Sequence, residues 1–496
     1  MSATNTSNTE TDPGASATGS ARAELRGNLG VVSLVFTVIA FNGPMAILAG
    51  FIPVLVSAGN GLGTPLTFVT LGALVLVFAV GLNAMASRMS QPGAFYTYIS
   101  AGIGKPPGLA AGFLAIAAYV TLGSGTYALF ALMCEHLLTS TFHLAGGPPW
   151  WVWALAGWAV GTLLSLFNVD VSAKVLGIAA LAEIALAVIW NFRIYLNGGP
   201  EGRTVDVMGS FFSGSLTMAM VFGLVSLTGF ESLQVFRSES RDPGRTVPRA
   251  TYFSVALLAG LYAVSSYAYI VGFGPSNATT AGASDPTGSM LQSIAHYVAA
   301  PAADIANVLL MTSSFAACLA IQNITARYFF TFGRDRILPT RLGVANSKHG
   351  SPMAAAALGG AIILVLFALP ALFGGDATAT FTNLVGVGGY CLVVLWVTTS
   401  IAVVVFFHRR RAERIGVWKA TVAPVIAAAG LGTILVLSTT HFSDILGGNQ
   451  TAANISLAIL TIICLAGIGL GFWYRSKRPS TYRLIGSQAE SVESLQ

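Results

Sequence analysis

Twelve long apolar stretches, separated by short polar segments, constrain this 496-residue chain more than any other feature. A helix needs about 20 apolar residues to cross roughly 30 Å of hydrocarbon. The stretches predict membrane-spanning helices at residues 30–56, 65–86, 108–138, 150–167, 172–196, 210–235, 250–273, 301–332, 353–374, 380–407, 419–440 and 452–474. Only 9% of the residues are charged, against about 25% in a soluble domain. The sequence therefore predicts an all-α polytopic membrane protein with about 12 transmembrane helices.

Basic residues gather in alternate gaps between these stretches. If all the stretches cross the membrane, every one of the 25 Lys and Arg residues except Arg193 and Arg203 falls on the same side. Short loops rich in cationic side chains stay in the cytoplasm, so this asymmetry predicts a multi-pass protein of the cell (inner) membrane with both termini cytoplasmic. The net charge of +6 is then a topology signal near lipid head groups, and we expect no nucleic acid partner.

The chain divides into four expected parts. Residues 1–27 are rich in Ser, Thr, Ala and Gly and have no apolar core, so we expect a disordered cytoplasmic tail. Residues 28–408 would form a ten-helix core, residues 409–475 two peripheral transmembrane helices, and residues 476–496 a cytoplasmic C-terminal tail. The segment near Gly274–Ser289 is the longest on the outer side, and it is expected to fold partly over the mouth of the core.

Residues typical of enzymes and cofactor sites are scattered through the chain. The four Cys and six His residues show no metal-ligand spacing, and we expect no metal, no cofactor and no enzymatic activity. The string Gly102-Ile103-Gly104-Lys105 lacks the spacing and the Ser or Thr of a phosphate-binding loop.

The first apolar stretch is interrupted near its middle by Asn42-Gly43-Pro44. Proline cannot donate the helical hydrogen bond, and its ring clashes with the preceding turn. In hydrocarbon, backbone groups that leave a helix must face protein or a water-filled cavity. This break therefore lines a cavity or is a packed kink.

The sixth stretch carries a matching interruption, Phe222-Gly223-Leu224-Val225-Ser226-Leu227-Thr228-Gly229-Phe230-Glu231. If the core consists of two five-helix halves of opposite orientation, the first and sixth spans are equivalent, and paired breaks indicate a transport site at the midplane. Freed N–H groups at a half-helix start favour a carboxylate, and freed carbonyls favour an ammonium or sodium ion. Such a site suits an amino acid.

Three local patterns resemble signatures of one transporter family. The first is Gln91-Pro92-Gly93-Ala94-Phe95-Tyr96-Thr97-Tyr98-Ile99 with Gly102, Gly104 and Gly108, similar to Pro-x-Gly-Gly-x-Tyr-x-Tyr. The second is Gly229-Phe230-Glu231 with Glu239, Asp242-Pro243 and Val247-Pro248-Arg249-Ala250. The third is Ala326-Arg327, Gly333-Arg334-Asp335, Leu338-Pro339 and Ser351-Pro352. Over residues 25–475 the chain resembles the amino acid–polyamine–organocation superfamily of permeases, which have the LeuT-type fold.

The resemblance implies a ten-helix core of two inverted five-helix repeats and a secondary transporter that works by symport or exchange. It also implies a substrate carboxylate bound at the first break and an amine bound at carbonyls of the sixth span. The corresponding residues here are Asn42, Gly43, Pro44 and Met45, together with Val225, Ser226, Leu227 and Thr228. Many relatives have aromatic residues where this chain has Val225 and Leu227, so the aromatic lid is expected either to be absent or to be supplied by another residue, for instance Phe222 or Tyr119.

Two alternatives for a coupling ion follow from polar residues within the spans. Glu183 lies about 17 Å along the fifth span, a depth at which an ionised side chain is costly and usually functional. It could carry a proton, or it could be a permanently protonated structural carboxyl. Thr312 and Ser313 in the eighth span could instead hold sodium, as hard oxygen ligands, or simply pack against a neighbouring helix.

These observations predict an amino acid permease of the lipid bilayer that is proton-coupled or an exchanger, with a small-molecule substrate. A polyamine or amine permease and a sodium-coupled symporter are the alternatives within transport. Few acidic residues face the expected pocket, which disfavours a multiply charged cation. A channel would show filter or charge rings, which the sequence lacks, and a receptor is the remaining class. The substrate and the oligomeric state stay open.

Overall fold

Apolar helices long enough to cross a bilayer make up most of the chain in the computed structural model. The structure describes residues 29–89, 95–142, 147–167, 173–346, 351–410 and 416–486. Within these ranges, 11 helical segments have the length and hydropathy of a membrane span, and the shorter helix α7 is apolar as well. The protein is therefore a polytopic all-α membrane protein of about 12 spans, as the sequence predicts.

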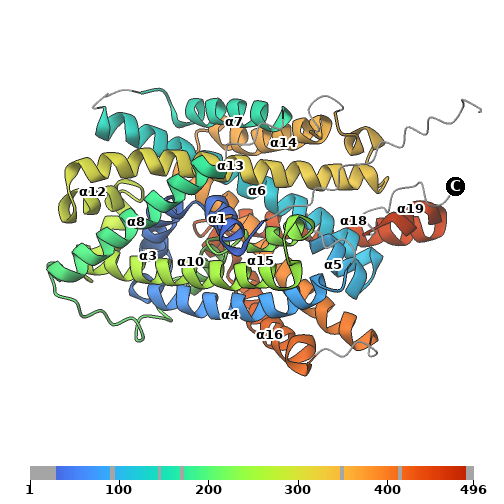
Figure 1. Ribbon diagram of the computed structural model, residues 1–496. Helices are drawn as coiled ribbons and strands as arrows, with labels where there is room; N and C mark the ends of the chain where they lie inside the picture. Colours follow the sequence, from blue (N-terminus) through green and yellow to red (C-terminus); the bar gives the residue numbers. More distant parts are fainter. Residues whose placement is uncertain are drawn as a thin grey trace, which may run out of the picture.

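The spans follow the expected order along the chain (Figure 1). They are α1 (Val31–Asn42) with α2 (Pro44–Ala46) and α3 (Ile52–Ala58), α4 (Thr64–Ala86), α6 (Lys105–His136), α7 (Trp150–Leu166), α8 (Ala173–Asn197), α9 (Leu216–Val225), α10 (Pro243–Phe273), α13 (Ala300–Arg334), α14 (Met353–Leu372), α15 (Ala377–Arg409), α16 (Ala423–Thr440) and α18 (Gln450–Lys477). Shorter helices are α5 (Phe95–Gly102), α11 (Ala278–Ser284), α12 (Gly288–Tyr297), α17 (Phe442–Ile445) and α19 (Pro479–Leu484). The remaining helical turns are η1 (Ile47–Phe51), η2 (Gly61–Gly63), η3 (Leu137–Thr141), η4 (Phe230–Glu239), η5 (Thr340–Gly343) and η6 (Trp418–Val422).

Two spans start more than five residues away from the predicted position. The sixth span was expected to start at residue 210, but α9 starts only at Leu216, where the Ser215 side chain accepts a hydrogen bond from the Met218 backbone N–H. The seventh span was expected from residue 250, but α10 starts at Pro243 and continues through Pro248. Proline fits the first turn of a helix because its missing N–H would have no partner there.

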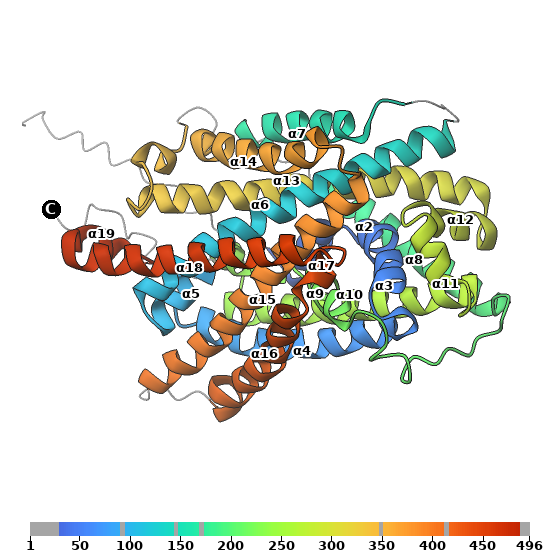
Figure 2. The same ribbon diagram turned by 180° about the vertical axis from the view of Figure 1, so that it is seen from behind.

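Helix α6 lies in the centre of the bundle and packs along α13, α15 and α18, while α4 packs along α10. Figure 2 shows α16 and α18 on the outer side of α15 and α6. In the apolar stretches of α16 and α18, only 28% and 17% of the residues are buried, against 78% in the span that contains α6. These two spans are therefore the least buried of the 11.

Small residues allow the central helices to approach closely. A Cβ added to Gly72 of α4 would lie 2.5 Å from the Cβ of Ala259 in α10, and one added to Gly112 of α6 would meet the Phe332 ring of α13 at 2.5 Å. Helices in lipid associate through such close packing because lipid and side chains are equally apolar.

The two ends of the bundle differ in structure (Figure 1). At one end, which we call the loop end, residues 274–289 were expected to form a loop. They include helix α11 instead, whose Gly282 lies against the Pro53 carbonyl and Ser57 of α3. The segment therefore packs against α3, the last helix of the first span.

At the opposite end, which we call the tail end, the C-terminal segment packs onto the bundle. The Gly486 N–H donates to the Tyr96 hydroxyl, which donates to Asp335 Oδ2 at 2.7 Å. Lys105 Nζ donates to the carbonyls of Tyr482 and Arg483 at 2.9 and 2.6 Å. Burial raises the pKa of Asp335 to about 6, although the Tyr96 hydrogen bond acts in the opposite direction. A tail was expected from residue 476, yet residues 479–486 belong to this packed region, whereas the expected N-terminal tail at 1–27 lies outside the described residues.

Candidate functional site

The first span is broken at one residue, as its sequence suggests. Helix α1 ends at Asn42, Gly43 has a φ of 62°, and α2 begins at Pro44. The left-handed conformation is accessible to glycine because it lacks a Cβ. A Cβ at this position would also lie 2.8 Å from Ser313 Oγ in α13. Glycine is therefore required here both by backbone conformation and by the approach of a neighbouring helix.

The sixth span is broken over four residues. Helix α9 ends at Val225, residues 226–229 form a turn, and a tighter 3₁₀ segment starts at Phe230. Gly229 has a φ of 100°, and its N–H donates to Glu231 Oε2 at 2.9 Å. Both predicted breaks are thus present within spanning helices.

Asn42 joins the two breaks through its side chain. Its Nδ2 donates to the Ser226 carbonyl at 2.8 Å and to the Thr228 carbonyl at 3.2 Å. Its Oδ1 accepts a hydrogen bond from the Tyr262 hydroxyl of α10. The carbonyls that the sixth-span break exposes are therefore bound by a side chain of the first span, which satisfies polar groups that would be costly unpaired in hydrocarbon.

Glu183 of α8 is bonded to the other side of the first break. Its Oε2 accepts hydrogen bonds from the Met45 N–H at 3.0 Å and from the Ser313 hydroxyl at 3.1 Å. The side chain is buried, with 3% of its surface exposed. A carboxylate is the expected partner for an N–H group at the start of a helix. Here the protein itself supplies that carboxylate.

The other predicted coupling residue, Thr312, does not join this cluster. It lies on an exposed face of α13, and its hydroxyl donates to the Val308 and Leu309 carbonyls of its own helix. Adjacent residues of a helix point in directions about 100° apart, so Ser313 and Thr312 cannot both face the same neighbour.

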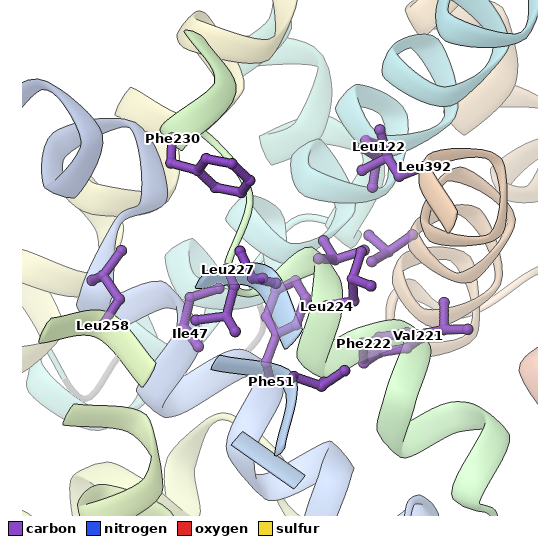
Figure 3. Packing of buried hydrophobic residues seen from close by; sticks show 14 of the residues in the cluster. Ile47, Phe51, Leu122, Val221, Phe222, Leu224, Leu227, Phe230, Leu258 and Leu392 are labelled. Atoms are coloured by element: carbon purple, nitrogen blue, oxygen red, sulfur yellow. The ribbon is translucent and has the colours of Figure 1, made fainter. Parts of the chain in front are cut away.

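The predicted apolar site residues pack among other side chains. Phe222 is fully buried, with ring centroids 5.6 Å from Phe51 and 6.1 Å from Phe381. Figure 3 shows Phe51 and Phe222 next to each other, and Ile47 next to Leu227 where the two broken spans meet. Val225 and Leu227 are buried as well. Phe222 is therefore part of an aromatic cluster beside the sixth-span break.

A second carboxyl, that of the partly buried Glu231, lies just after this break. Glu231 Oε1 accepts a hydrogen bond from the Tyr119 hydroxyl of α6 at 3.5 Å. The Tyr119 ring lies 5.5 Å from that of Tyr328 in α13. Tyr119 thus links α6 to the sixth span. Within the described ranges, no group of three or more His, Cys, Asp or Glu residues could hold a metal ion.

Comparison with known proteins identifies the family to which this chain belongs. The family profile described as "Amino acid permease" matches residues 35–482. This chain belongs to the amino acid permease family. The matched region contains both broken spans. The match confirms the resemblance to permeases that the three sequence patterns indicate.

Curated relatives of this permease have several substrates in their names. It is 27% identical over 383 residues to the low-affinity putrescine importer PlaP of Escherichia coli (strain K12). The aligned region covers 73% of this chain and 81% of the relative. It is 25% identical over 400 residues to the branched-chain amino acid permease BcaP of Bacillus subtilis (strain 168), covering 75% and 78%. It is also 25% identical over 311 residues to a probable GABA permease of Pseudomonas aeruginosa, covering 59% and 62%.

Sequence reasoning missed the side-chain bridge between the breaks. Asn42 was predicted as a backbone contributor to the site, whereas its carboxamide makes the contacts. Tyr262 was not singled out, because a tyrosine inside an apolar span carries no local signal of its partner 220 residues away. An Asn directly before Gly-Pro was the available clue, since a carboxamide in hydrocarbon requires partners.

Proposed function

We propose that this permease moves a small amino acid across the cytoplasmic membrane by alternating access, with a site between the first- and sixth-span breaks. The observation that carries this proposal is the hydrogen-bonded junction of the two breaks through Asn42. Interrupted helices in corresponding halves are typical of substrate sites in secondary transporters. We further infer the LeuT-type five-plus-five core over residues 28–408, with cytoplasmic termini as the basic residues indicate.

Two groups of the protein occupy positions that suit the two ends of an amino acid. Asn42 Nδ2 donates hydrogen bonds to the Ser226 and Thr228 carbonyls, where a substrate ammonium would bind. The Glu183 carboxyl accepts a hydrogen bond from the Met45 N–H, where a substrate carboxylate would bind. In this proposal the substrate ammonium displaces the Asn42 carboxamide from at least one carbonyl. Substrate binding and release would then loosen and restore the contact between the two broken spans.

Coupling to protons is proposed to act through Glu183. Its two donors come from α2 and α13, so a movement of α8 away from these two helices would remove both hydrogen bonds from one carboxylate oxygen. A proton can then replace the lost donors, because an unpaired charge is costly within the membrane. Sodium coupling has less support, since only Ser313 of the predicted Ser–Thr pair lies in this cluster.

The alternative substrate class is a polyamine or another amine. It is supported by the similarity to the putrescine importer PlaP and by Glu231, a second carboxyl next to the sixth-span break. A dication would require a carboxylate at each end, and Glu183 is already bonded to Met45 and Ser313. We therefore place the amino acid first.

Uptake into proteoliposomes tests the substrate and the coupling together. Radiolabelled branched-chain amino acids, GABA and putrescine would be compared with and without an imposed pH or sodium gradient. We expect an amino acid to accumulate under a pH gradient and Glu183→Gln to abolish accumulation while retaining exchange. Glu135→Gln, a neutralised carboxyl on an exposed part of α6, is the matched control. Accumulation of putrescine alone would show that the substrate is a polyamine and not an amino acid. Unchanged accumulation by Glu183→Gln would exclude a role for Glu183 in proton coupling.

A further inference from the structure

A cavity of about 670 Å³ lies at the loop end, away from the junction of the two breaks. It is bordered by the ends of α8, α10 and α12, and its lining includes Arg193, Asn197, Phe273, Gln292 and His296. None of the described residues that line it is acidic. Arg193 is also one of the two basic residues that the sequence assigns to this end of the protein.

The polar groups of this cavity retain donors for a ligand. Arg193 donates from Nε to the Tyr297 carbonyl at 3.0 Å. Its two terminal nitrogens make no hydrogen bond or ion pair with the described part of the chain. The His296 ring packs edge-on against Tyr297, with 4.8 Å between centroids, and its nitrogens likewise have no partner in the described ranges. A guanidinium fork and an imidazole N–H suit the oxygens of a phosphate.

The scaffold beneath these groups is held in place by buried hydrogen bonds. Trp190 Nε1 donates to Ser293 Oγ at 3.1 Å, which joins α8 to α12. The Tyr297 hydroxyl donates to the Gly272 carbonyl at 2.7 Å, which joins α12 to α10. The position of the Arg193 guanidinium is therefore set before a ligand arrives, which reduces the ordering cost of binding.

The surface next to the cavity is apolar. Phe192, Tyr195 and Leu196 of α8 are 58%, 58% and 53% exposed. They belong to a spanning helix, so these side chains face lipid near the membrane boundary, where aromatic residues are enriched. A ligand in this cavity would meet a guanidinium and an imidazole at one end and an apolar helix face at the other.

We propose that this cavity binds the phosphate of an anionic phospholipid, with Arg193 and His296 contacting the head group and the acyl chains lying along α8. Free phosphate has the same charge chemistry, but it has no part that would cover Phe192, Tyr195 and Leu196. Lipid is therefore the source that the combined polar and apolar surfaces favour. This proposal is independent of the substrate that the permease carries.

The test uses the full-length protein in nanodiscs that contain phosphatidylcholine and an increasing fraction of phosphatidylglycerol. The melting temperature is measured at each fraction, and native mass spectrometry counts the retained lipids. We expect the wild type to be stabilised at low phosphatidylglycerol fractions. Losing one charge-assisted contact in Arg193→Gln or His296→Gln should raise the fraction needed for half the shift on the order of tenfold.

Arg203→Gln is the matched control. It removes a positive charge from the same end, but Arg203 stacks on Tyr195 at 4.9 Å and does not line the cavity. Because Arg203 contacts Tyr195 on the proposed acyl-chain surface and not the head-group site, this variant should shift the midpoint less than Arg193→Gln does. An unchanged midpoint in Arg193→Gln, or an equal change in Arg203→Gln, would overturn the site. The same stabilisation by inorganic phosphate in pure phosphatidylcholine nanodiscs would overturn the assignment to lipid.

Discussion

Gly43→Ala should displace the first break and lower the free energy of unfolding of the permease by about 1–5 kcal/mol. An L-residue in the left-handed region costs roughly 1–2 kcal/mol. The added Cβ would lie 2.8 Å from Ser313 Oγ and 3.3 Å from the Ser313 carbonyl oxygen, and overpacking of this kind costs about 1–3 kcal/mol. The reduced freedom of the unfolded chain returns about 0.4–1 kcal/mol.

The site should be affected more than the fold, because the new methyl group pushes α2 and α13 apart where Glu183 bridges them. We therefore expect expression to persist, the melting temperature to fall by several degrees and uptake in proteoliposomes to be lost. Gly469→Ala is the control, since a Cβ at this position in α18 meets nothing within 4 Å. It should be neutral or slightly stabilising.

A second variant separates the two contributions to this cost. Adding Ser313→Ala to Gly43→Ala removes the hydroxyl contact but leaves the carbonyl contact and the left-handed backbone. The double variant should recover part of the stability lost in Gly43→Ala, beyond the additive expectation. If Gly43→Ala matched Gly469→Ala in both melting temperature and uptake, the argument for a steric and conformational requirement at the break would be refuted.

Three further perturbations test the polar contacts. Asn42→Leu should cost roughly 2–5 kcal/mol because it leaves the Ser226 and Thr228 carbonyls without their shared donor, and normal stability and uptake would count against the bridge. Tyr262→Phe removes one hydrogen bond to Asn42 and should reduce stability by only about 1 kcal/mol while raising the substrate KM, which transport kinetics would detect. Burial raises the pKa of Asp335 from 3.8 to about 6, so its stabilising contribution is complete below pH 4 and is lost as the pH rises through 6. Between pH 4 and pH 8 the free energy of unfolding of the wild type should therefore fall by at most about 3 kcal/mol. The melting temperature should fall with it, and less steeply in Asp335→Asn; equal slopes would show that Asp335 does not titrate with folding.

The sequence alone determined the class of fold and the location of both breaks. Length and hydropathy define a spanning helix, because the bilayer has a fixed thickness. Gly43-Pro44 and the Gly-Ser-Thr run of the sixth span interrupt a helix through local backbone chemistry. These properties depend on neighbouring residues, so the order of the chain is sufficient to predict them.

Which side chains meet at the breaks was decided only by the tertiary structure. Asn42 reaches the Ser226 carbonyl across 184 residues, and Glu183 reaches Met45 across 138. Ser313 faces Glu183 while Thr312 faces away, a distinction set by the rotation of α13 against its neighbours. The rotation of a helix about its axis depends on how its entire surface packs against the neighbouring helices. The partners of a polar residue therefore could not be predicted from the sequence of its own helix.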